Sequence, residues 1–231
     1  MFRNLRNNFD FHLRNKIKFN RPLSPNAKID DLAIRMQSEL REFLDLFRWK
    51  MVLEKMDLVP GDPLVIGDIG TRTFVIAPVL DQIFRELNFS PEVHGFEVDA
   101  YRRFTNFRSR ADYGHFYAMQ IPKGEYHTQD FNYWNGDLHI ALLLNPFVTE
   151  EPLLRWGLPR KFLRPEFLFD NTHKSLRKNR GILLVSSPTI EEYRIAQYLA
   201  VQSGFRRIQE ETWRHSDNSL QGQPRYGALF I

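Results

Sequence analysis

Two carboxylates, Asp68 and Glu97, are the residues of this chain best suited to hold a small molecule. Asp68 begins a turn with Gly70 after the apolar run 64–66, and Glu97 ends a second apolar run about one helix later. In an open parallel sheet, ligands bind outside the carboxyl ends of the strands. A glycine turn lets the backbone approach a ligand, and a carboxylate at the next strand end accepts hydrogen bonds from ribose hydroxyls. We therefore expect both acids side by side at a ligand-binding edge.

The segments that would position these acids alternate between short apolar runs and amphipathic stretches. Strands are predicted at about residues 64–67, 93–97, 125–129, 138–144 and 182–185, and helices at about 78–87, 111–119, 165–178 and 189–203. Two last strands, 205–211 and 226–231, flank a polar stretch at 217–224 that suits a hairpin turn. This order predicts an α/β protein with a Rossmann-like, doubly wound, mostly parallel seven-stranded sheet. A C-terminal antiparallel hairpin and three α/β/α layers complete the prediction.

Proline and capping residues at the start of several helices define the expected helix boundaries. Pro78 is tolerated only in a first turn, so residues 71–77 are predicted to form a loop. Thr189, with Glu192 three residues on, has the pattern of a capping box. Asp99 is predicted to cap a helix over residues 101–107, and Ser109 to cap its continuation.

Charge and periodicity divide the chain into three parts. Residues 1–25 form a basic amphipathic arm, residues 26–59 a helical cap, and residues 60–231 the Rossmann domain. The cap is read as one helical stripe from Ile29 to Met56, which could cover the ligand side of the sheet or belong to the core.

The basic arm carries most of the positive charge. Residues 1–28 hold seven Lys or Arg and one acid, a net charge of +6, while the remainder carries −2. Its apolar residues recur at helical spacing, namely Phe2, Leu5, Phe9, Leu13 and Ile17. Such a helix could pack on the body, on a partner or on a second subunit, lie on an anionic membrane surface, or serve as a transit sequence. No specific nucleic-acid signature accompanies it.

The absence of cysteine excludes a disulfide framework, thiolate zinc sites and cysteine catalysis. It fits a reducing compartment, and with no apolar run of about 18–20 residues and no secretory start, a cytoplasmic location is predicted.

The histidines are scattered and show no HExxH or other ligand spacing, so no metal site is predicted; those considered are His94, His115, His127, His139, His173 and His215. Nucleophile-elbow and phosphate-loop motifs are also missing, which argues against hydrolase and nucleotide triphosphatase activities.

The sequence from about residue 60 to residue 231 resembles the class I S-adenosylmethionine-dependent methyltransferases. Asp68-Ile69-Gly70-Thr71 matches the start of the family's glycine-rich turn, and Glu97 the acid that holds the ribose. Asp130 matches by position an acid near the adenine, and Asn145-Pro146-Phe147 stands where the fourth strand faces the methyl group. The resemblance implies S-adenosylmethionine as cofactor, with Asn145 as a candidate substrate contact; the implied cofactor-binding residues are Asp68, Gly70, Thr71, Arg72, Glu97 and Asp130.

Three segments, 68–74, 97–103 and 152–159, are similar to an uncharacterised bacterial branch of this fold. The chain departs from the family at Arg72 and Phe74, which replace glycines of the turn. Side chains there could block the methionine moiety or serve it, with Arg72 holding the cofactor's carboxylate.

These observations lead to an expected methyl transfer with an unknown acceptor and no assigned catalytic base. The alternative is a non-catalytic methyltransferase-like module used for binding or assembly. A dinucleotide-dependent oxidoreductase is a third possibility, opposed by the absence of Gly-x-Gly-x-x-Gly after the first strand.

Overall fold

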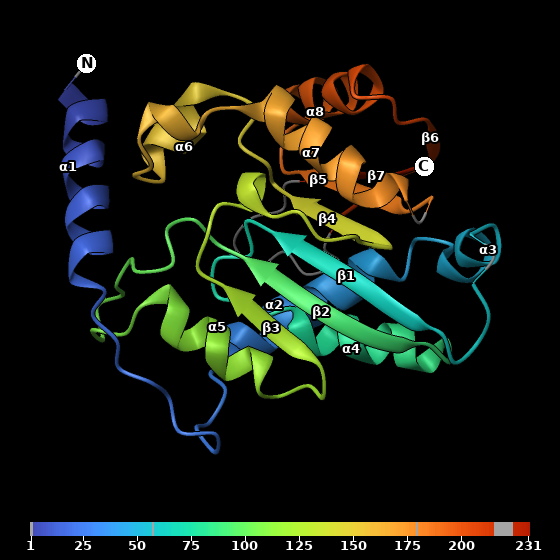
Figure 1. Ribbon diagram of the computed structural model, residues 1–231, viewed down its shortest axis with the longest axis horizontal. Helices are drawn as coiled ribbons and strands as arrows, with labels where there is room; N and C mark the ends of the chain where they lie inside the picture. The colour runs from blue at the N-terminus through green and yellow to red at the C-terminus, as the bar shows by residue number, and fades with distance from the viewer. Residues whose placement is uncertain (1, 57, 179, 215–223) are drawn as a thin grey trace.

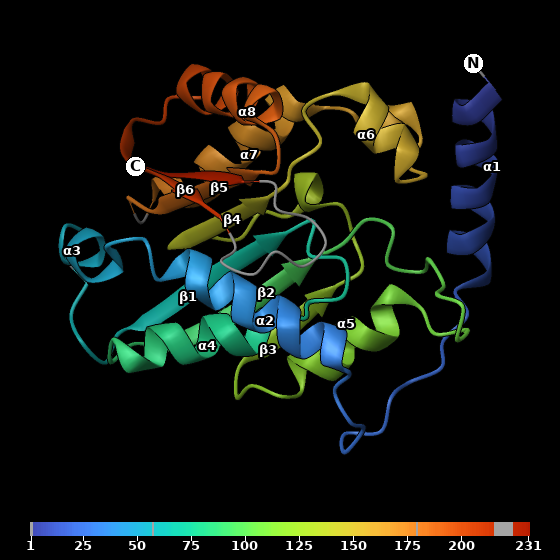
Figure 2. The same ribbon diagram turned by 180° about the vertical axis from the view of Figure 1, so that it is seen from behind.

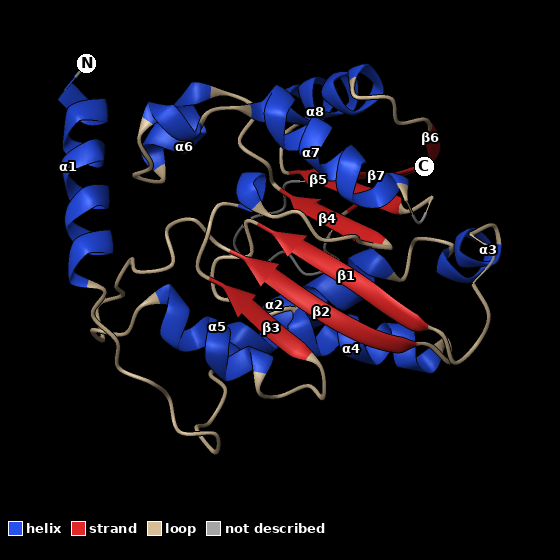
Figure 3. Cartoon of the chain, in the orientation of Figure 1, coloured by secondary structure: helices blue, strands red, loops and turns tan. Residues whose placement is uncertain are grey.

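The computed structural model describes residues 2–56, 58–178, 180–214 and 224–231, so His215 and positions 217–223 of the predicted turn lie outside the described residues. One sheet of seven strands forms the centre, and helices cover both of its faces (Figure 1, Figure 3). The strands are β1 (Pro63–Ile69), β2 (Ser90–Phe96), β3 (Gly124–His127), β4 (Ile140–Leu144), β5 (Ile182–Ser187), β6 (Arg207–Trp213) and β7 (Arg225–Phe230). The helices are α1 (Phe2–Ile17), α2 (Asp31–Leu44), α3 (Trp49–Glu54), α4 (Ala77–Glu86), α5 (Arg110–Ala118), α6 (Glu150–Arg155), α7 (Pro165–Arg177) and α8 (Ile190–Gln202), with short 3₁₀ helices η1 (Phe131–Tyr133) and η2 (Arg160–Phe162).

The strand order is β3-β2-β1-β4-β5-β7-β6. β1 to β5 pair in parallel, whereas β7 runs antiparallel to both β5 and β6. The chain moves outward from β1 through β2 and β3, then returns to the other side of β1 as β4. This reversal makes the carboxyl ends of β1 and β4 a topological switch point, where doubly wound sheets bind ligands. The predicted α/β architecture with its C-terminal hairpin is confirmed.

Each face of the sheet has its own apolar layer. α2, α4 and α5 cover one face and α7 and α8 the other (Figure 1, Figure 2). In β4, Ile140 and Leu142 belong to the first layer, while Ala141 and Leu143 belong to the second. A strand that is buried on both faces needs a continuous apolar run, which is why this segment gave a clear signal in the sequence.

Most of the predicted boundaries are confirmed. Pro78 lies in the first turn of α4, and Ser109 caps α5 in a reciprocal capping box with Asp112. The Thr189 side chain accepts a hydrogen bond from the backbone nitrogen of Glu192 at the start of α8. These signals are local, so they needed no knowledge of the tertiary structure.

Two predicted helices are wrong. Residues 99–109 form turns with a bridge between Arg103 and Ser109. The carboxylate of Asp99 cannot cap a helix there because two arginines occupy it. The continuous helix predicted up to Met56 is broken between α2 and α3, where the Trp49 indole donates to the Leu44 carbonyl at 2.9 Å.

A close contact beneath the turn after β1 leads to a stability prediction. A Cβ added at Gly95 would lie 2.5 Å from Cδ2 of Phe74. Because Phe74 is fully buried, its ring has little room to move. Gly95→Ala should therefore lower the free energy of unfolding by about 1–3 kcal/mol in a urea titration. In a Phe74→Leu background, Gly95→Ala should lower the free energy of unfolding by less than it does in the parent. If the effects of the two substitutions simply add, the contact between Phe74 and residue 95 is not the cause.

Candidate functional site

The carboxyl ends of β1 and β2 bring Asp68 and Glu97 to the same rim of the sheet, as predicted. The strands are parallel, with Asp68 opposite Gly95 and Ile69 opposite Phe96. The backbone nitrogens of Gly70 and Thr71 both donate to the Phe96 carbonyl, at 2.8 and 3.1 Å, which ties the turn to β2. α1 and α6 stand beyond this end of the strands (Figure 1).

Asp68 is buried beneath the turn. Its carboxylate accepts a hydrogen bond from the Thr71 hydroxyl. Burial raises the pKa of Asp68 to about 7, and the negative charge of Glu97 adds to the increase. Asp68 is therefore partly protonated near neutral pH.

Glu97 is buried as well, and its carboxylate is held by three donors. Oε2 accepts from the backbone nitrogen of Arg72 at 2.9 Å. Oε1 accepts from the backbone nitrogen of Asp99 at 2.7 Å and from Nη1 of Arg110 at 3.2 Å. A carboxylate offers about four lone-pair sites, so one acceptor site on Oε2 remains for a ligand hydroxyl.

Arg72 and Phe74 adopt the left-handed backbone conformation that glycine usually supplies, with φ of 58° and 59°. Phe74 turns its ring into the core against Gly95 and Tyr126, so it does not stand above the turn. At Gly70, whose φ is 78°, the place of a Cβ is open space. The turn therefore keeps a glycine cradle at Gly70 despite its departures from the family pattern.

The Arg72 side chain spans from the turn to α6. Its guanidinium lies over the Trp156 ring, with Cζ 4.5 Å from the ring centroid. Burial, followed by the charge of Arg110, lowers the pKa of Arg72. Its Nε is buried and makes no hydrogen bond to another described residue. A buried donor without a partner costs free energy, and the carboxylate of a ligand would satisfy it.

Asp130 and Asn145 lie at the ends of their predicted strands. Asp130 follows β3 and accepts a hydrogen bond from the backbone nitrogen of Asn132 at 3.0 Å, which caps η1. Asn145 follows β4, is exposed, and accepts from Nη1 of Arg225 at 3.3 Å. Nearby, the rings of Phe147 and Trp156 are 6.4 Å apart. The structure thus brings Asp130 to the β3 side of the rim and Asn145 to the β4 side.

The arm docks on this rim through its polar face. The buried Asn7 donates to the carbonyls of Leu154 and Leu158, both at 3.0 Å. Arg14 pairs with the buried Asp99, at 3.0 Å from Nη2 to Oδ1. Between α1 and the loop after β2 lies a cavity of about 430 Å³. A larger cavity, about 530 Å³, lies between α3 and α4 at the opposite end of the sheet and is remote from the two acids.

The arm packs on the body, which is one of the alternatives that the sequence left open, but its apolar stripe does not make that contact. All five of its residues are exposed, namely Phe2, Leu5, Phe9, Leu13 and Ile17. Asn7 on the other side of the helix is the residue that is buried. Among the helices that the structure describes, none combines the length and apolar character needed to cross a bilayer.

Three groups of functional interest escaped the sequence analysis. The buried Arg110 of α5 pairs with Glu97, and Arg102 pairs with Asp99. The pair of Arg102 and Asp99 has a local i,i+3 spacing, whereas Arg110 reaches Glu97 from thirteen residues further along the chain. His94, Glu125 and His127 also come together, on strands β2 and β3. Glu125 and His127 are two residues apart in a strand and share a face, which was the available signal.

No protein-family model matches the chain, and a search of curated protein sequences finds no match. Solved structures do match. Magnesium protoporphyrin IX methyltransferase from Synechocystis PCC 6803 with bound S-adenosylmethionine is 11% identical at a TM-score of 0.53, covering 89% of this chain and 86% of its own. An S-adenosylmethionine-dependent methyltransferase from Leishmania major is 11% identical at a TM-score of 0.53, covering 88% and 74%. Geranyl diphosphate methyltransferase in complex with GPP and sinefungin is 12% identical at a TM-score of 0.53, covering 85% of this chain and 78% of its own.

The chain has the class I methyltransferase fold. Sequence identities of 11–12% show a shared fold and no more. The fold that the resemblance in the sequence implied is therefore confirmed. The narrower likeness to a bacterial branch stays a prediction.

The raised pKa of Asp68 predicts a pH-dependent stability. The pKa of Asp68 is about 7 in the folded chain, compared with the ordinary value of 3.8 that applies to the unfolded chain. The preference of the folded chain for protonated Asp68 therefore contributes stability that is fully present below about pH 3.8. That contribution is lost as pH rises through about 7, up to about 4 kcal/mol for such a shift. The melting temperature of Asp68→Asn relative to the parent should therefore increase between about pH 5 and about pH 8.5.

The exposed Asp137, which pairs with Lys178, provides a matched control. Asp137→Asn should show no such trend over the same pH range. If the difference in melting temperature between Asp68→Asn and the parent is the same across this pH range, Asp68 is ionised at every pH in it.

Proposed function

We propose that this protein transfers a methyl group from S-adenosylmethionine to an acceptor. The observation that carries the proposal is the meeting of Asp68 and Glu97 at adjacent strand ends, beside the switch point of β1 and β4. Ligands of doubly wound sheets bind in the crevice at such a point. The methyltransferase fold of the chain supports the same conclusion.

The residues at the rim fit the cofactor. The free acceptor site on Glu97 suits a ribose hydroxyl, and Gly70 leaves room for a close approach of the ligand to the turn. The Nε of Arg72, which has no hydrogen-bond partner among the described residues, suits the cofactor's carboxylate. Asp130, which follows β3, suits a contact with the adenine. Thr71 helps indirectly because its hydroxyl fixes the Asp68 carboxylate.

Bound S-adenosylmethionine supplies an electrophilic methyl group on its sulfonium. The chain then has to align the acceptor with that group and keep water out. Trp156, Phe147 and the docked α1 border the space beyond the strand ends. Asn145 follows β4, the strand that pairs with β1 on the side away from β2, and is our candidate substrate contact.

The cavity under α1 supports an acceptor that carries negative charge. Four arginines line it against one acid, Asp10; they are Arg6, Arg14, Arg102 and Arg103. Although Asp99 engages Arg14 and Arg102, the lining retains an excess of positive charge.

Calorimetric titration of the full chain with S-adenosylhomocysteine tests the proposal. We expect one binding site per chain. Arg72→Gln should weaken binding by about tenfold or more, because it removes a charge-assisted hydrogen bond of about 1.5–3 kcal/mol. Arg155→Gln serves as the control, since Arg155 is exposed on α6 and pairs with Glu151. A folded sample that binds neither S-adenosylhomocysteine nor S-adenosylmethionine would contradict methyl transfer.

A binding or assembly module is the second candidate function. It is favoured by the fact that three of the four acceptor sites of Glu97 are already used within the chain. If the cofactor cannot compete with these hydrogen bonds, it does not bind, and the protein keeps the methyltransferase fold without the activity. The same titration decides between the two, and NAD as a further titrant tests the oxidoreductase alternative.

A further inference from the structure

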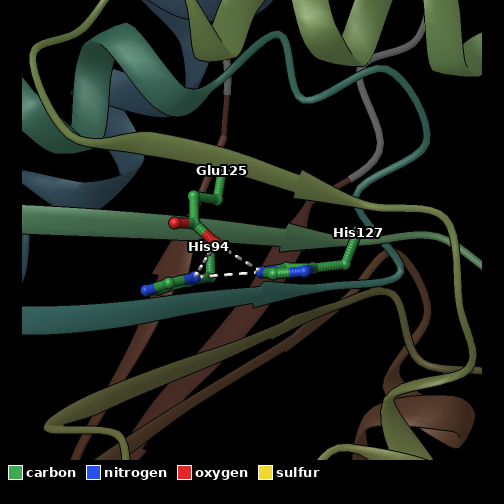
Figure 4. A group of neighbouring side chains, drawn as sticks. All are labelled: His94, Glu125 and His127. Atoms are coloured by element: carbon green, nitrogen blue, oxygen red, sulfur yellow. Dashed lines mark hydrogen bonds and ion pairs between the residues drawn. The ribbon is translucent and has the colours of Figure 1, made fainter.

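Three side chains on the face of the sheet opposite Asp68 and Glu97 converge on one point. His94 of β2 lies opposite Glu125 of β3 in the parallel register, and His127 is two residues further on. Nδ1 of His94 is 3.0 Å from Nε2 of His127, and each of these atoms is 3.6 Å from Oε2 of Glu125 (Figure 4). The three rest on regular strands, so their spacing is set by the sheet.

We propose that these residues bind a divalent transition metal ion, zinc in the first place. A triangle with sides of 3.0, 3.6 and 3.6 Å has a point about 2.0 Å from every corner, which is the length of zinc bonds to nitrogen and oxygen. Two imidazoles and one carboxylate favour zinc and its neighbours over magnesium or calcium, which prefer oxygen.

A fourth residue supports the assignment independently. Oε1 of Glu92 lies 3.2 Å from Nε2 of His94, the ring nitrogen that faces away from the cluster. A proton on that nitrogen leaves the lone pair of Nδ1 directed at the proposed ion. Histidine ligands of metals commonly donate their other ring nitrogen to a carboxylate in this way. The ring of His127 also stacks on Phe96, with centroids 4.7 Å apart, which limits its rotation.

The ion would join a short edge strand to its neighbour. β3 has four residues, and it leads directly to Asp130. Because the ion would hold Glu125 and His127 against His94, it would also fix the end of β3, which Asp130 follows. Among the described residues three side chains supply ligand atoms, so a tetrahedral zinc would keep one position for water.

Zinc titration of the chelator-treated full chain tests the site. We expect one zinc per chain, a higher melting temperature, and a tetrahedral absorption spectrum with cobalt as a substitute. Glu125→Gln should weaken zinc binding by more than about 100-fold, and Glu92→Gln by about 10–100-fold. Glu125 is 62% exposed, so its substitution leaves folding intact. His12→Ala, an exposed histidine of α1, is the control and should not change the affinity.

Two results would overturn the metal proposal. One is the absence of zinc, cobalt, nickel, iron and manganese binding to the folded chain. The other is zinc binding that Glu125→Gln and His127→Ala both leave unchanged. Either would reduce the cluster to a hydrogen bond between two histidines. Neither result bears on S-adenosylmethionine binding, which is measured separately.

The exposed stripe of α1 carries a second, independent inference. Asn7, Arg14 and the Phe11 ring, which packs on Phe162 with centroids 4.7 Å apart, fix the opposite face of the helix to the body. The apolar stripe is therefore held outward, with Phe2 89% and Phe9 68% exposed. A fixed helix with an outward apolar face cannot bury it by local rearrangement.

We infer that α1 binds an anionic lipid surface. Arg3, Arg6 and Lys16 are exposed on the same helix, and residues 1–28 carry a net charge of +6. Two such arms would repel each other, which disfavours a second copy as the partner. An amphipathic helix with basic residues and exposed phenylalanines is suited to the headgroup region of an anionic membrane.

Co-sedimentation of the full chain with vesicles tests this inference. We expect binding to phosphatidylcholine vesicles that contain phosphatidylglycerol, and little binding to phosphatidylcholine alone. Phe2→Ser with Phe9→Ser should weaken binding by about tenfold or more, since each ring buries apolar area in the membrane. Val201→Ser, an exposed apolar residue of α8, is the control. Equal binding to both vesicle types, no binding, or concentration-dependent dimerisation through α1 would overturn it.

Discussion

Two buried carboxylates, Glu97 and Asp99, set the constraint on which the rim of the sheet depends. A buried charge is tolerated only when it is paired and hydrogen-bonded. Glu97 meets this requirement with the backbone nitrogen of Arg72 and the guanidinium of Arg110. Asp99 meets it with Arg14 and Arg102. Four segments are thereby fixed at one place, namely the turn after β1, the loop after β2, α5 and α1.

The same constraint shapes what the rim can bind. Glu97 accepts three hydrogen bonds from its own chain and has one acceptor site left. A ligand hydroxyl would therefore meet a carboxylate that is already oriented. Arg72 gives its backbone nitrogen and carbonyl to the fold, yet the Nε of its side chain makes no hydrogen bond within the described part of the chain. A buried polar atom without a hydrogen bond calls for an explanation, and a bound ligand would supply one for Arg72.

The two faces of β2 and β3 serve different purposes. Glu97 projects from one face into the ion-pair network, while His94 and His127 meet on the other. The backbone joins the two sites directly, because the nitrogen of Glu97 donates to the carbonyl of His127 at 3.1 Å. An ion that fixes His127 would therefore also restrain Glu97, although the sites bind through different atoms.

The sequence by itself determined the strands, the caps at Ser109 and Thr189, and the common rim of Asp68 and Glu97. Periodicity and capping are local signals, and parallel strands align their ends once the order is known. Only the tertiary structure decided that Asp99 binds Arg14, that α1 turns its apolar stripe outward, and that two histidines meet. These outcomes depend on contacts between segments that are far apart in the sequence, and no local pattern encodes such contacts.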